Sequence, residues 1–262
     1  MARRAVAYRA CCIAMNDLFG NLKDRAIERL KAFEPAEGYY VAYSGGKDSD
    51  CILNLVRQSG VKYDAHYHLT TCDPPELVRH VKTQPDVEIK RPELTMWQLI
   101  RKKKMPPRRQ ARYCCEHLKE GGGANRLVVT GVRWGESKRR SKRRMTERCI
   151  RGKNKTFLHP IIDWDSSDVW AFIRVEGIKY CSLYDEGFKR LGCVLCPMTR
   201  DVERQMKRWP QICRAWERAV KATFKKRQHL TYNTAEEYWQ WWLDRDAKGP
   251  KTDTAQMMMF ED

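Results

Sequence analysis

Residues 38–49 read GYYVAYSGGKDS, and this stretch decides the fold. Residues 39–43 are mostly aromatic or β-branched, which is typical of a buried strand. A short glycine-containing loop, residues 44–49, follows this strand. Residues 50–58 (DCILNLVRQ) then have the pattern of a helix that ends at Gly60. The stretch therefore predicts a strand, a glycine turn and a helix in direct succession.

The glycine turn has the composition of a phosphate-binding loop. Its glycines let backbone N–H groups turn inward, and the N-terminus of the next helix adds partial positive charge. The side chains add a full positive charge, hydroxyl donors and a carboxylate that can orient either Mg²⁺ or the loop itself. An ordinary tight turn explains the glycine pair alone but not the six residues together, which are Ser44, Gly45, Gly46, Lys47, Asp48 and Ser49.

The same alternation continues along the chain. Strands are predicted at 63–69, 87–89 and 127–130, and helices are predicted from Pro74 and over 96–104. Strands that alternate with helices predict an α/β fold, an open, mostly parallel twisted sheet with helices on both faces. Ligands bind at the carboxyl ends of such strands, so the 44–49 loop and the segment 131–133 are expected at one edge.

The flanking segments are expected to be helical. Residues 16–33 suit an amphipathic helix, interrupted at Gly20. Asp165 or Ser166 is a plausible N-cap for a helix over 169–175, and Thr234 forms a capping box with Glu237. Core packing is favoured over base stacking for the Trp-rich end, which contains Trp209, Trp216, Trp239, Trp241 and Trp242. We expect three parts: an N-terminal helical segment, 1–35, a nucleotide-binding domain with the cysteines, 36–200, and a helical extension, 201–262.

The composition is that of a globular protein. The chain has 262 residues, of which 42% are hydrophobic and 10% aromatic, and this excludes wholesale disorder. No run approaches the ~18 apolar residues of a membrane span. Arg9 interrupts the apolar part of the N-terminus, which argues against a signal peptide. We expect a cytoplasmic protein without membrane contact.

The charge balance is strongly basic. There are 51 Lys and Arg residues against 33 Asp and Glu, a net charge of +18, which attracts polyanions. Residues 101–112 hold seven cations and residues 138–144 hold six, and both runs flank the predicted site in sequence. A small sulfate ester needs two or three cations. Nucleic acid is therefore the favoured partner, and a basic surface kept for solubility is the alternative.

The spacing of the cysteines indicates metal or sulfur chemistry. The 11 cysteines are an odd number, and four of them form two pairs, Cys114-Cys115 and Cys193-x-x-Cys196. Such thiolate sets bind Zn²⁺ or an iron–sulfur cluster, and adjacent cysteines suit a single tetrahedral Zn²⁺ poorly. The cysteines without partner spacing are predicted to be buried small hydrophobes; they are Cys11, Cys12, Cys51, Cys72, Cys149 and Cys213.

The loop 44–49 resembles the PP-loop of the ATP pyrophosphatase and phosphoadenosine phosphosulfate (PAPS) reductase superfamily. Further blocks with a similar pattern follow in order, and together they cover residues 39 to 197. They are RYCCEHLK (112–119), GVRWGES (131–137), HPIIDW (159–164) with DVW (168–170), YDEGF (184–188) and GCVLCP (192–197). The resemblance implies an adenine nucleotide α-hydrolase-like fold.

The resemblance also implies roles for particular residues. Arg133 and Arg140 are expected to contact phosphate or sulfate, with plain surface arginine as the alternative, and Glu136 either stabilises Arg133 or holds Mg²⁺. The C-C…C-x-x-C pattern is similar to the 4Fe–4S site of assimilatory adenylylsulfate reductases, which favours a 4Fe–4S cluster over Zn²⁺. Cys181 is an alternative ligand in place of one member of the Cys114-Cys115 pair.

The resemblance leaves the reaction open between two mechanisms. The sulfonucleotide reductases carry a nucleophilic cysteine in a C-terminal tail, and residues 251–262 contain none. The favoured hypothesis is therefore an ATP pyrophosphatase that uses ATP and Mg²⁺, with Lys47, Asp48, Arg133 and Glu136 as catalytic residues.

The expected substrate is a nucleic acid, which the enzyme adenylates for sulfur insertion. DNA phosphorothioation and tRNA thiolation are both compatible with the sequence, and the sulfur would come from a donor protein such as a cysteine desulfurase. The alternatives are a PAPS or adenosine phosphosulfate reductase and an ATP-gated binding subunit without catalysis. An oligomer is compatible with the sequence.

Overall fold

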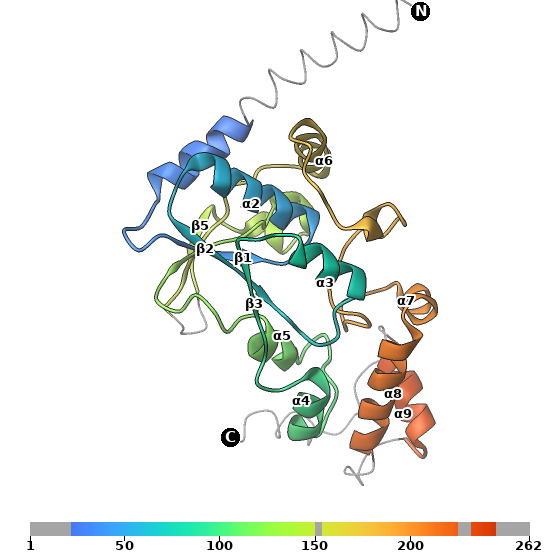
Figure 1. Cartoon of the computed structure of the whole chain (residues 1–262). Coiled ribbons are helices and arrows are strands. Elements are labelled where there is room, and N and C mark those ends of the chain that lie inside the picture. The colour runs from blue at the N-terminus through green and yellow to red at the C-terminus, as the bar shows by residue number, and fades with distance from the viewer. Residues whose placement is uncertain (1–21, 150–153, 225–231, 245–262) are drawn as a thin grey trace, which may run out of the picture. The chain divides into compact units, whose positions relative to one another are not determined.

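The computed structural model describes residues 22–149, 154–224 and 232–244 (Figure 1). These residues form two compact units whose segments alternate along the chain. The sheet unit contains the described residues up to His68, Pro75–Lys90 and Gly121–Leu191. The cysteine unit contains Leu69–Pro74, Arg91–Glu120 and the described residues from Gly192 onward. These units describe compactness alone, so the three domains 1–35, 36–200 and 201–262 stay a prediction.

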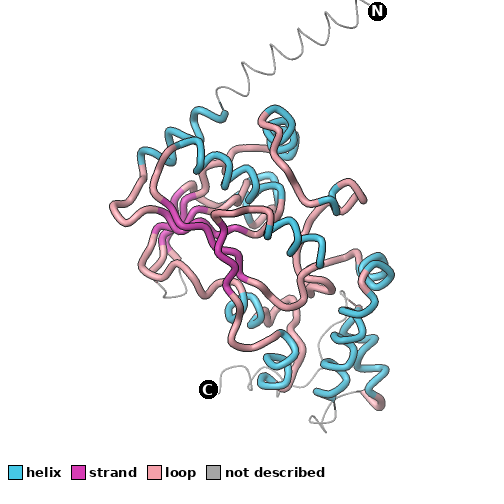
Figure 2. Tube along the Cα trace, viewed as in Figure 1, coloured by secondary structure: helices cyan, strands magenta, loops and turns pink. Residues whose placement is uncertain are grey.

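A six-stranded sheet, coloured magenta in Figure 2, forms the core of the sheet unit. Its strand order is β3-β2-β1-β4-β6-β5, and all neighbours are parallel except the antiparallel pair β5 and β6. The predicted mostly parallel α/β sheet is confirmed. The strands are β1 (Tyr39–Tyr43), β2 (Tyr63–His68), β3 (Val87–Lys90), β4 (Leu127–Val129), β5 (Thr146–Arg148) and β6 (Thr156–Leu158).

Strand β1 lies at the point where the strand order changes direction. It pairs with β2 on one side and with β4 on the other, both in parallel. Tyr39, Tyr40 and Val41 are buried, as the aromatic and β-branched pattern predicts. The segments that follow β1 and β4 leave the sheet from neighbouring carboxyl ends, the usual position of a ligand site in such sheets.

Helices of the sheet unit begin and end close to the predicted residues. Residues 22–32 are helical, whereas 16–21 lie outside the described residues. Helix α2 ends at Gly60, whose φ of 73° favours glycine. Asp165 caps α6 by accepting the backbone N–H groups of Ser167 and Asp168. The helices are α2 (Lys47–Ser59), α3 (Pro75–Lys82) and α6 (Ser166–Val175), with single turns η1 (Trp134–Glu136), η2 (Arg140–Lys142) and η3 (Ser182–Tyr184).

Tryptophans form much of the core of the cysteine unit. Trp216 is fully buried, contacts Trp97 edge to face and stacks on Trp242. This confirms core packing for these rings. Thr234 caps α9 by accepting the Glu237 N–H, as predicted, although the Glu237 carboxylate accepts the N–H of Asn233 instead of completing the box. The helices are α4 (Met96–Lys103), α5 (Tyr113–Leu118), α7 (Val202–Arg208), α8 (Pro210–Phe224) and α9 (Ala235–Leu243).

Several features differ from the sequence expectations or extend them. Strands β5 and β6 and helix α5 were not predicted. Cys51 and Cys213 are buried as predicted, but Cys149 is partly exposed, and Cys11 and Cys12 lie outside the described residues. No helix of the described ranges is both long and apolar enough to cross a bilayer.

Candidate functional site

The loop between β1 and α2 is held in one shape by its own side chains. Gly45 has a φ of +72°, and a Cβ at this position would lie 2.8 Å from the side chains of Leu77 and Val81. The Ser49 hydroxyl donates to the Gly46 carbonyl at 2.7 Å, and the Ser44 hydroxyl donates to that of Ser49 at 3.1 Å. The loop is therefore set before a ligand arrives, with the N-terminus of α2 at its end.

Lys47 and Arg133 share one carboxylate. The Lys47 ammonium lies 2.9 Å from the Asp48 carboxylate, and the Arg133 Nε donates to the same carboxylate at 2.7 Å. The Arg133 and Lys47 side chains are 4% and 8% exposed, so both charges are largely shielded from water. Two cations around one anion leave a positive charge at the switch point, which suits an anionic ligand.

Glu136 fixes the position of Arg133. It accepts the Arg133 backbone N–H at 3.0 Å and forms an ion pair with Arg140. The Arg133 Nη1 also donates to the Trp164 carbonyl at 3.3 Å. Of the two roles left open for Glu136, the geometry shows the contact that stabilises Arg133. Arg140 joins the network through Glu136.

The structure thus joins residues from three segments of the sequence into one network of ion pairs and hydrogen bonds within the sheet unit. They are Asp48, Arg133, Glu136 and Arg140. The structure also adds Tyr184, which lies in the YDEGF block but had no assigned role. The Tyr184 hydroxyl accepts the Lys47 backbone N–H at 3.0 Å, and burial raises the pKa of that hydroxyl. The block was visible in the sequence, but the contact across 137 residues was not.

Asp50 is a further residue that sequence reasoning missed. This carboxylate is buried in the first turn of α2, where its Oδ1 accepts the Tyr43 hydroxyl at 2.5 Å and lies 3.0 Å from the His80 Nε2. Its Oδ2 is buried without a hydrogen-bond partner among the described residues. The only feature of the sequence that could have indicated Asp50 is its position as an acidic residue in the first turn of the helix.

Two cysteine pairs meet in the cysteine unit. The Cys114 thiol interacts with the Cys115 sulfur, which lowers the pKa of Cys115 to about 7, and the positive charge of Lys119 contributes. An interaction with the Cys72 thiol, with Lys119 contributing again, lowers the pKa of Cys193 to about 6. The hydrogen bond to Cys115 and burial raise the pKa of Cys114, and the charges of Cys193 and Cys196 raise it further. The four predicted ligands are therefore within electrostatic reach of one another.

Cys72 is buried, as predicted, and it also lies beside one of the predicted ligands. It is fully buried, but its carbonyl accepts the Val194 N–H at 2.8 Å, which places it beside Cys193. The Thr70 hydroxyl lies 3.4 Å from the Cys72 sulfur and 3.3 Å from that of Cys193. Burial raises the pKa of Cys72 well above its usual value. No spacing rule in the sequence pairs residue 72 with residue 193.

The chemistry of these cysteines suits a soft metal ion or an iron–sulfur cluster. In the described ranges, no three His, Cys, Asp or Glu side chains are close enough to hold a metal ion as they stand. A tetrahedral Zn²⁺ needs its sulfurs about 3.8 Å apart, given Zn–S bonds of about 2.3 Å. A four-iron cluster holds its thiolates further apart, and soft thiolates are its usual ligands.

Two further residues bear on the predicted cysteine centre, Lys119 and Cys181. The charge of Cys193, followed by those of Asp73, Cys196 and Cys115, raises the pKa of Lys119, so its positive charge persists beside these groups. Cys181 belongs to the sheet unit. Its pKa is raised by burial and by Asp50 and Glu76, which are in the same unit.

Seven of the thirteen cations in the two basic runs are exposed, and the other six are partly buried. Arg101, Lys102 and Lys103 form the last turn of α4, where cations stabilise the helix dipole. In the sheet unit, Arg140 and Arg143 pair with Glu136 and Glu147. Four exposed cations of that run have no ion pair within the described ranges; they are Lys138, Arg139, Lys142 and Arg144.

Known proteins share parts of this chain. It is 27% identical over 205 residues to an uncharacterized protein of Methanocaldococcus jannaschii, covering 71% of this chain and 42% of that protein. It is 25% identical over 223 residues to an adenosine 5'-phosphosulfate reductase of Staphylococcus epidermidis, covering 74% of this chain and 88% of that enzyme. The chain spans less than half the length of its archaeal and phage relatives.

One solved structure has a similar fold. A variant of FMN adenylyltransferase from Candida glabrata superposes with a TM-score of 0.50 at 13% identity, covering 74% of this chain and 72% of that one. Residues 38–199, more than half of the chain, match the phosphoadenosine phosphosulfate reductase domain. This range contains the glycine loop, the Arg133 network and all four predicted cluster cysteines. The chain therefore belongs to the phosphoadenosine phosphosulfate reductase domain family.

Proposed function

We propose that this protein is a sulfur-transfer enzyme that cleaves ATP between the α- and β-phosphates and so activates a nucleic acid for thiolation. The sheet unit provides an anion site at the switch point of the sheet, as ATP binding requires. The cysteine unit provides the sulfur ligands, and the basic runs provide charge for a polyanion.

The residues of the anion site support α–β cleavage directly. Backbone N–H groups of the 44–49 loop and the Lys47 ammonium would hold the pyrophosphate that leaves, while Arg133 would neutralise charge at the α-phosphate. Asp48 would exchange its contacts with these cations for their contacts with phosphate. Mg²⁺, bound mainly by phosphate oxygens, would stabilise the leaving pyrophosphate when present, with Asp48 as the nearest carboxylate of the loop.

The state of Cys213 is the observation that favours this mechanism over sulfonucleotide reduction. Cys213 is the only cysteine after Cys196 among the described residues, and a tail-type nucleophile has to be an exposed thiolate. Instead its side chain is buried in α8, and burial raises its pKa to about 11. A buried neutral thiol cannot attack a sulfonucleotide.

The cysteine centre would serve the second half of the reaction. Cys114, Cys115, Cys193 and Cys196 would hold a 4Fe–4S cluster, which supplies a site for sulfur or electrons when bound. The sulfur would come from a persulfide-bearing donor protein such as a cysteine desulfurase. DNA and tRNA both remain compatible as the sulfur acceptor.

Sulfonucleotide reduction is the second candidate. It is supported by the relative from Staphylococcus epidermidis, which is named an adenosine 5'-phosphosulfate reductase and is aligned over 88% of its length. The same anion site would then bind a phosphosulfate, with the thiol supplied by another cysteine or a partner protein.

The deciding experiment follows AMP from α-labelled ATP under anaerobic conditions with Mg²⁺, with and without DNA or bulk tRNA. AMP formation stimulated by one nucleic acid supports the proposal and identifies the substrate class. Parallel reactions contain adenosine phosphosulfate or PAPS with a thiol reductant. Sulfite release in these reactions, with no AMP formed from ATP, would replace thiolation by sulfonucleotide reduction. Lys47→Ala protein provides the background in every arm.

A further inference from the structure

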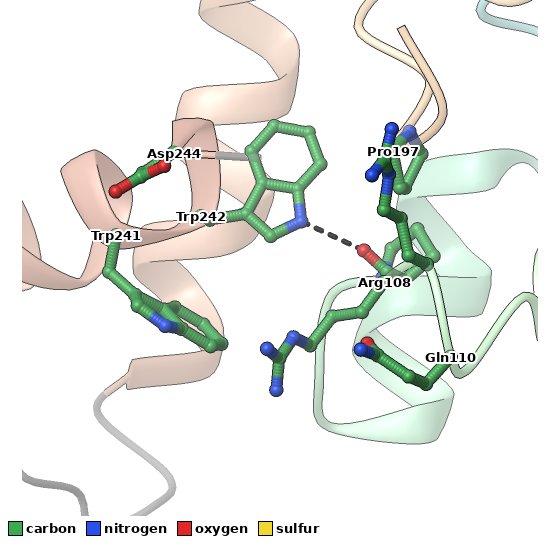
Figure 3. Close-up of a pocket in the computed structure, with 8 residues that line it drawn as sticks. Arg108, Gln110, Pro197, Trp241, Trp242 and Asp244 are labelled. Carbon is green, nitrogen blue, oxygen red and sulfur yellow. Dashed lines mark hydrogen bonds between the residues drawn. The ribbon is translucent and has the colours of Figure 1, made fainter. Parts of the chain in front are cut away.

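A small pocket in the cysteine unit has arginines in its wall and lies outside the sites described above (Figure 3). It is lined by Arg108, Arg109, Gln110, Pro197, Trp241 and Trp242, among others. Pro197 directly follows Cys196, so one wall of the pocket is within a residue's length of the cluster cysteines. The anion site around Lys47 makes no use of this pocket.

The two tryptophan rings of the pocket already have partners within the cysteine unit. The Arg108 guanidinium lies 4.6 Å from the centre of the Trp241 ring, and Tyr238 stacks on that ring at 5.0 Å. Trp242 stacks on both Trp216 and Trp239, and its Nε1 donates to the Pro107 carbonyl at 2.9 Å, the dashed line in Figure 3. Each tryptophan of the pocket therefore already has at least two ring or guanidinium partners among the described residues, which leaves the arginines as the groups available to a ligand.

The arginines, in contrast, have unused hydrogen-bonding capacity. The Nε of Arg109 is buried and has no hydrogen-bond partner in the described ranges. Arg108 is partly buried, and this loss of water lowers its pKa, although a guanidinium stays charged. Figure 3 shows the Asp244 carboxylate pointing away from the Arg108 guanidinium. The pocket therefore offers donors and positive charge, and an anion with several acceptor oxygens would satisfy them.

The size of the pocket limits what this anion can be. Its volume is about 40 Å³, a few times the roughly 10–15 Å³ that one bound water requires. A phosphate group fits, but a nucleoside does not. The guanidinium fork matches phosphate oxygens in two parallel hydrogen bonds, which a lysine cannot reproduce.

We propose that this pocket binds a single phosphate group of a nucleic-acid backbone and so positions the strand beside the cluster cysteines. The exposed cations Arg101 and Lys102 of the same unit would contact neighbouring phosphates. The inference rests on the proposed nucleic-acid substrate. The donor set itself recognises phosphate, whether in a polymer or free in solution.

The test measures binding of a fluorescent single-stranded oligonucleotide to the full chain without ATP, over a series of salt concentrations. For Arg109→Gln we expect about tenfold weaker binding and a salt slope lower by about 0.7, the value for one lost phosphate contact on a single strand. Arg109→Lys, which keeps the charge but loses the fork, should bind with intermediate affinity. The matched control is Arg91→Gln, which removes one exposed arginine of the same unit outside the pocket.

The remaining measurements distinguish a phosphate of a nucleic acid from free phosphate. They also distinguish a failure of this inference from a failure of the proposed function. Equal binding by Arg109→Gln and Arg91→Gln proteins, both folded by circular dichroism, overturns the inference. Quenching of tryptophan fluorescence by inorganic phosphate, lost in Arg109→Gln, without any oligonucleotide binding, overturns the nucleic-acid source and leaves a site for free phosphate. Oligonucleotide binding that depends on Arg109, in a wild-type protein that forms no AMP from ATP with or without nucleic acid, counts against the proposed function and not against this pocket.

Discussion

Gly131 lies against the backbone of Asp48: a Cβ at residue 131 would approach the Asp48 carbonyl oxygen to 2.9 Å. This contact joins the segment after β4 to the start of α2. It lets Arg133, two residues further on, reach the Asp48 carboxylate. The close approach of two backbones, and not a special φ angle, is what requires glycine here.

Gly131→Ala should therefore separate Asp48 from Arg133. Because displacements of about 1 Å can lower turnover by about 100-fold, we expect a large loss of nucleotide turnover with a smaller loss of stability. Gly135→Ala is the matched control, since a Cβ at residue 135 meets nothing within 4 Å. Steady-state turnover and thermal melting of both variants check the prediction. Equal activity in the two proteins would contradict it.

Lys47→Ala should abolish nucleotide turnover and spare the fold. The loss should be about 10²–10³-fold, as for other preorganised groups that stabilise charge in a transition state. The fold should persist because Asp48 keeps its ion pair with Arg133. Lys82→Ala, an exposed lysine in α3, is the control and should retain full turnover. Turnover in Lys47→Ala close to that of Lys82→Ala would remove Lys47 from the catalytic residues.

Cys193→Ser should lose bound iron and visible absorbance after anaerobic reconstitution with iron and sulfide. A serine hydroxyl replaces a soft thiolate ligand that a cluster prefers. Cys213→Ser should keep both signals, because Cys213 is buried in α8, where its thiol donates to the Gln205 carbonyl at 3.6 Å. Iron analysis and the absorption spectrum provide the measurement. Retention of the full iron content in Cys193→Ser would exclude Cys193 as a ligand.

The stability of the fold should fall below pH 6.5 because of His159. This side chain is 2% exposed, and burial lowers its pKa from 6.5 to about 4, so it stays neutral in the folded state. The unfolded chain binds a proton below pH 6.5 and the folded chain does not. The stability contributed at neutral pH is therefore lost as the pH falls from 6.5 towards 4.

His159→Gln should reduce this pH dependence. The loss of unfolding free energy between pH 7.5 and pH 5 should be smaller by about 2 kcal/mol than in the wild type, from about 1.5 pH units at 1.36 kcal/mol each. Denaturant unfolding at both pH values is the measurement. His117→Gln, at an exposed histidine in α5, should behave as the wild type. Identical pH dependence in wild type and His159→Gln would refute the assignment.

The sequence predicted the helices and strands best where a local residue pattern coincides with buried positions. Strand β1 and helix α2 carry strong periodicity with a glycine loop between them, and their boundaries agree with the structure to within a few residues. The N-cap Asp165 was also evident, because capping depends on residues next to each other in the chain. Strands β5 and β6 have only three residues each and include charged side chains, so no periodicity reveals them.

The network around the anion site was predicted as a set of residues but not as a set of contacts. The motif resemblance named Asp48 and Arg133, yet their ion pair joins positions 85 residues apart. Cys72 lies beside Cys193 because of a backbone hydrogen bond to Val194, which depends on tertiary structure alone. Such contacts follow from how the segments pack, and a single sequence carries no spacing rule for them.

The alternation of the two units has a practical consequence for protein engineering. The chain passes between them after residues 68, 74, 90, 120 and 191, so the cysteine unit has no single start and end in the sequence. A truncation after residue 191 would leave Leu69–Pro74 and Arg91–Glu120 without the helices that complete their unit. The cysteine unit therefore cannot be cut out or grafted as one piece. Swapping it between relatives requires three coordinated exchanges, and natural recombination faces the same barrier.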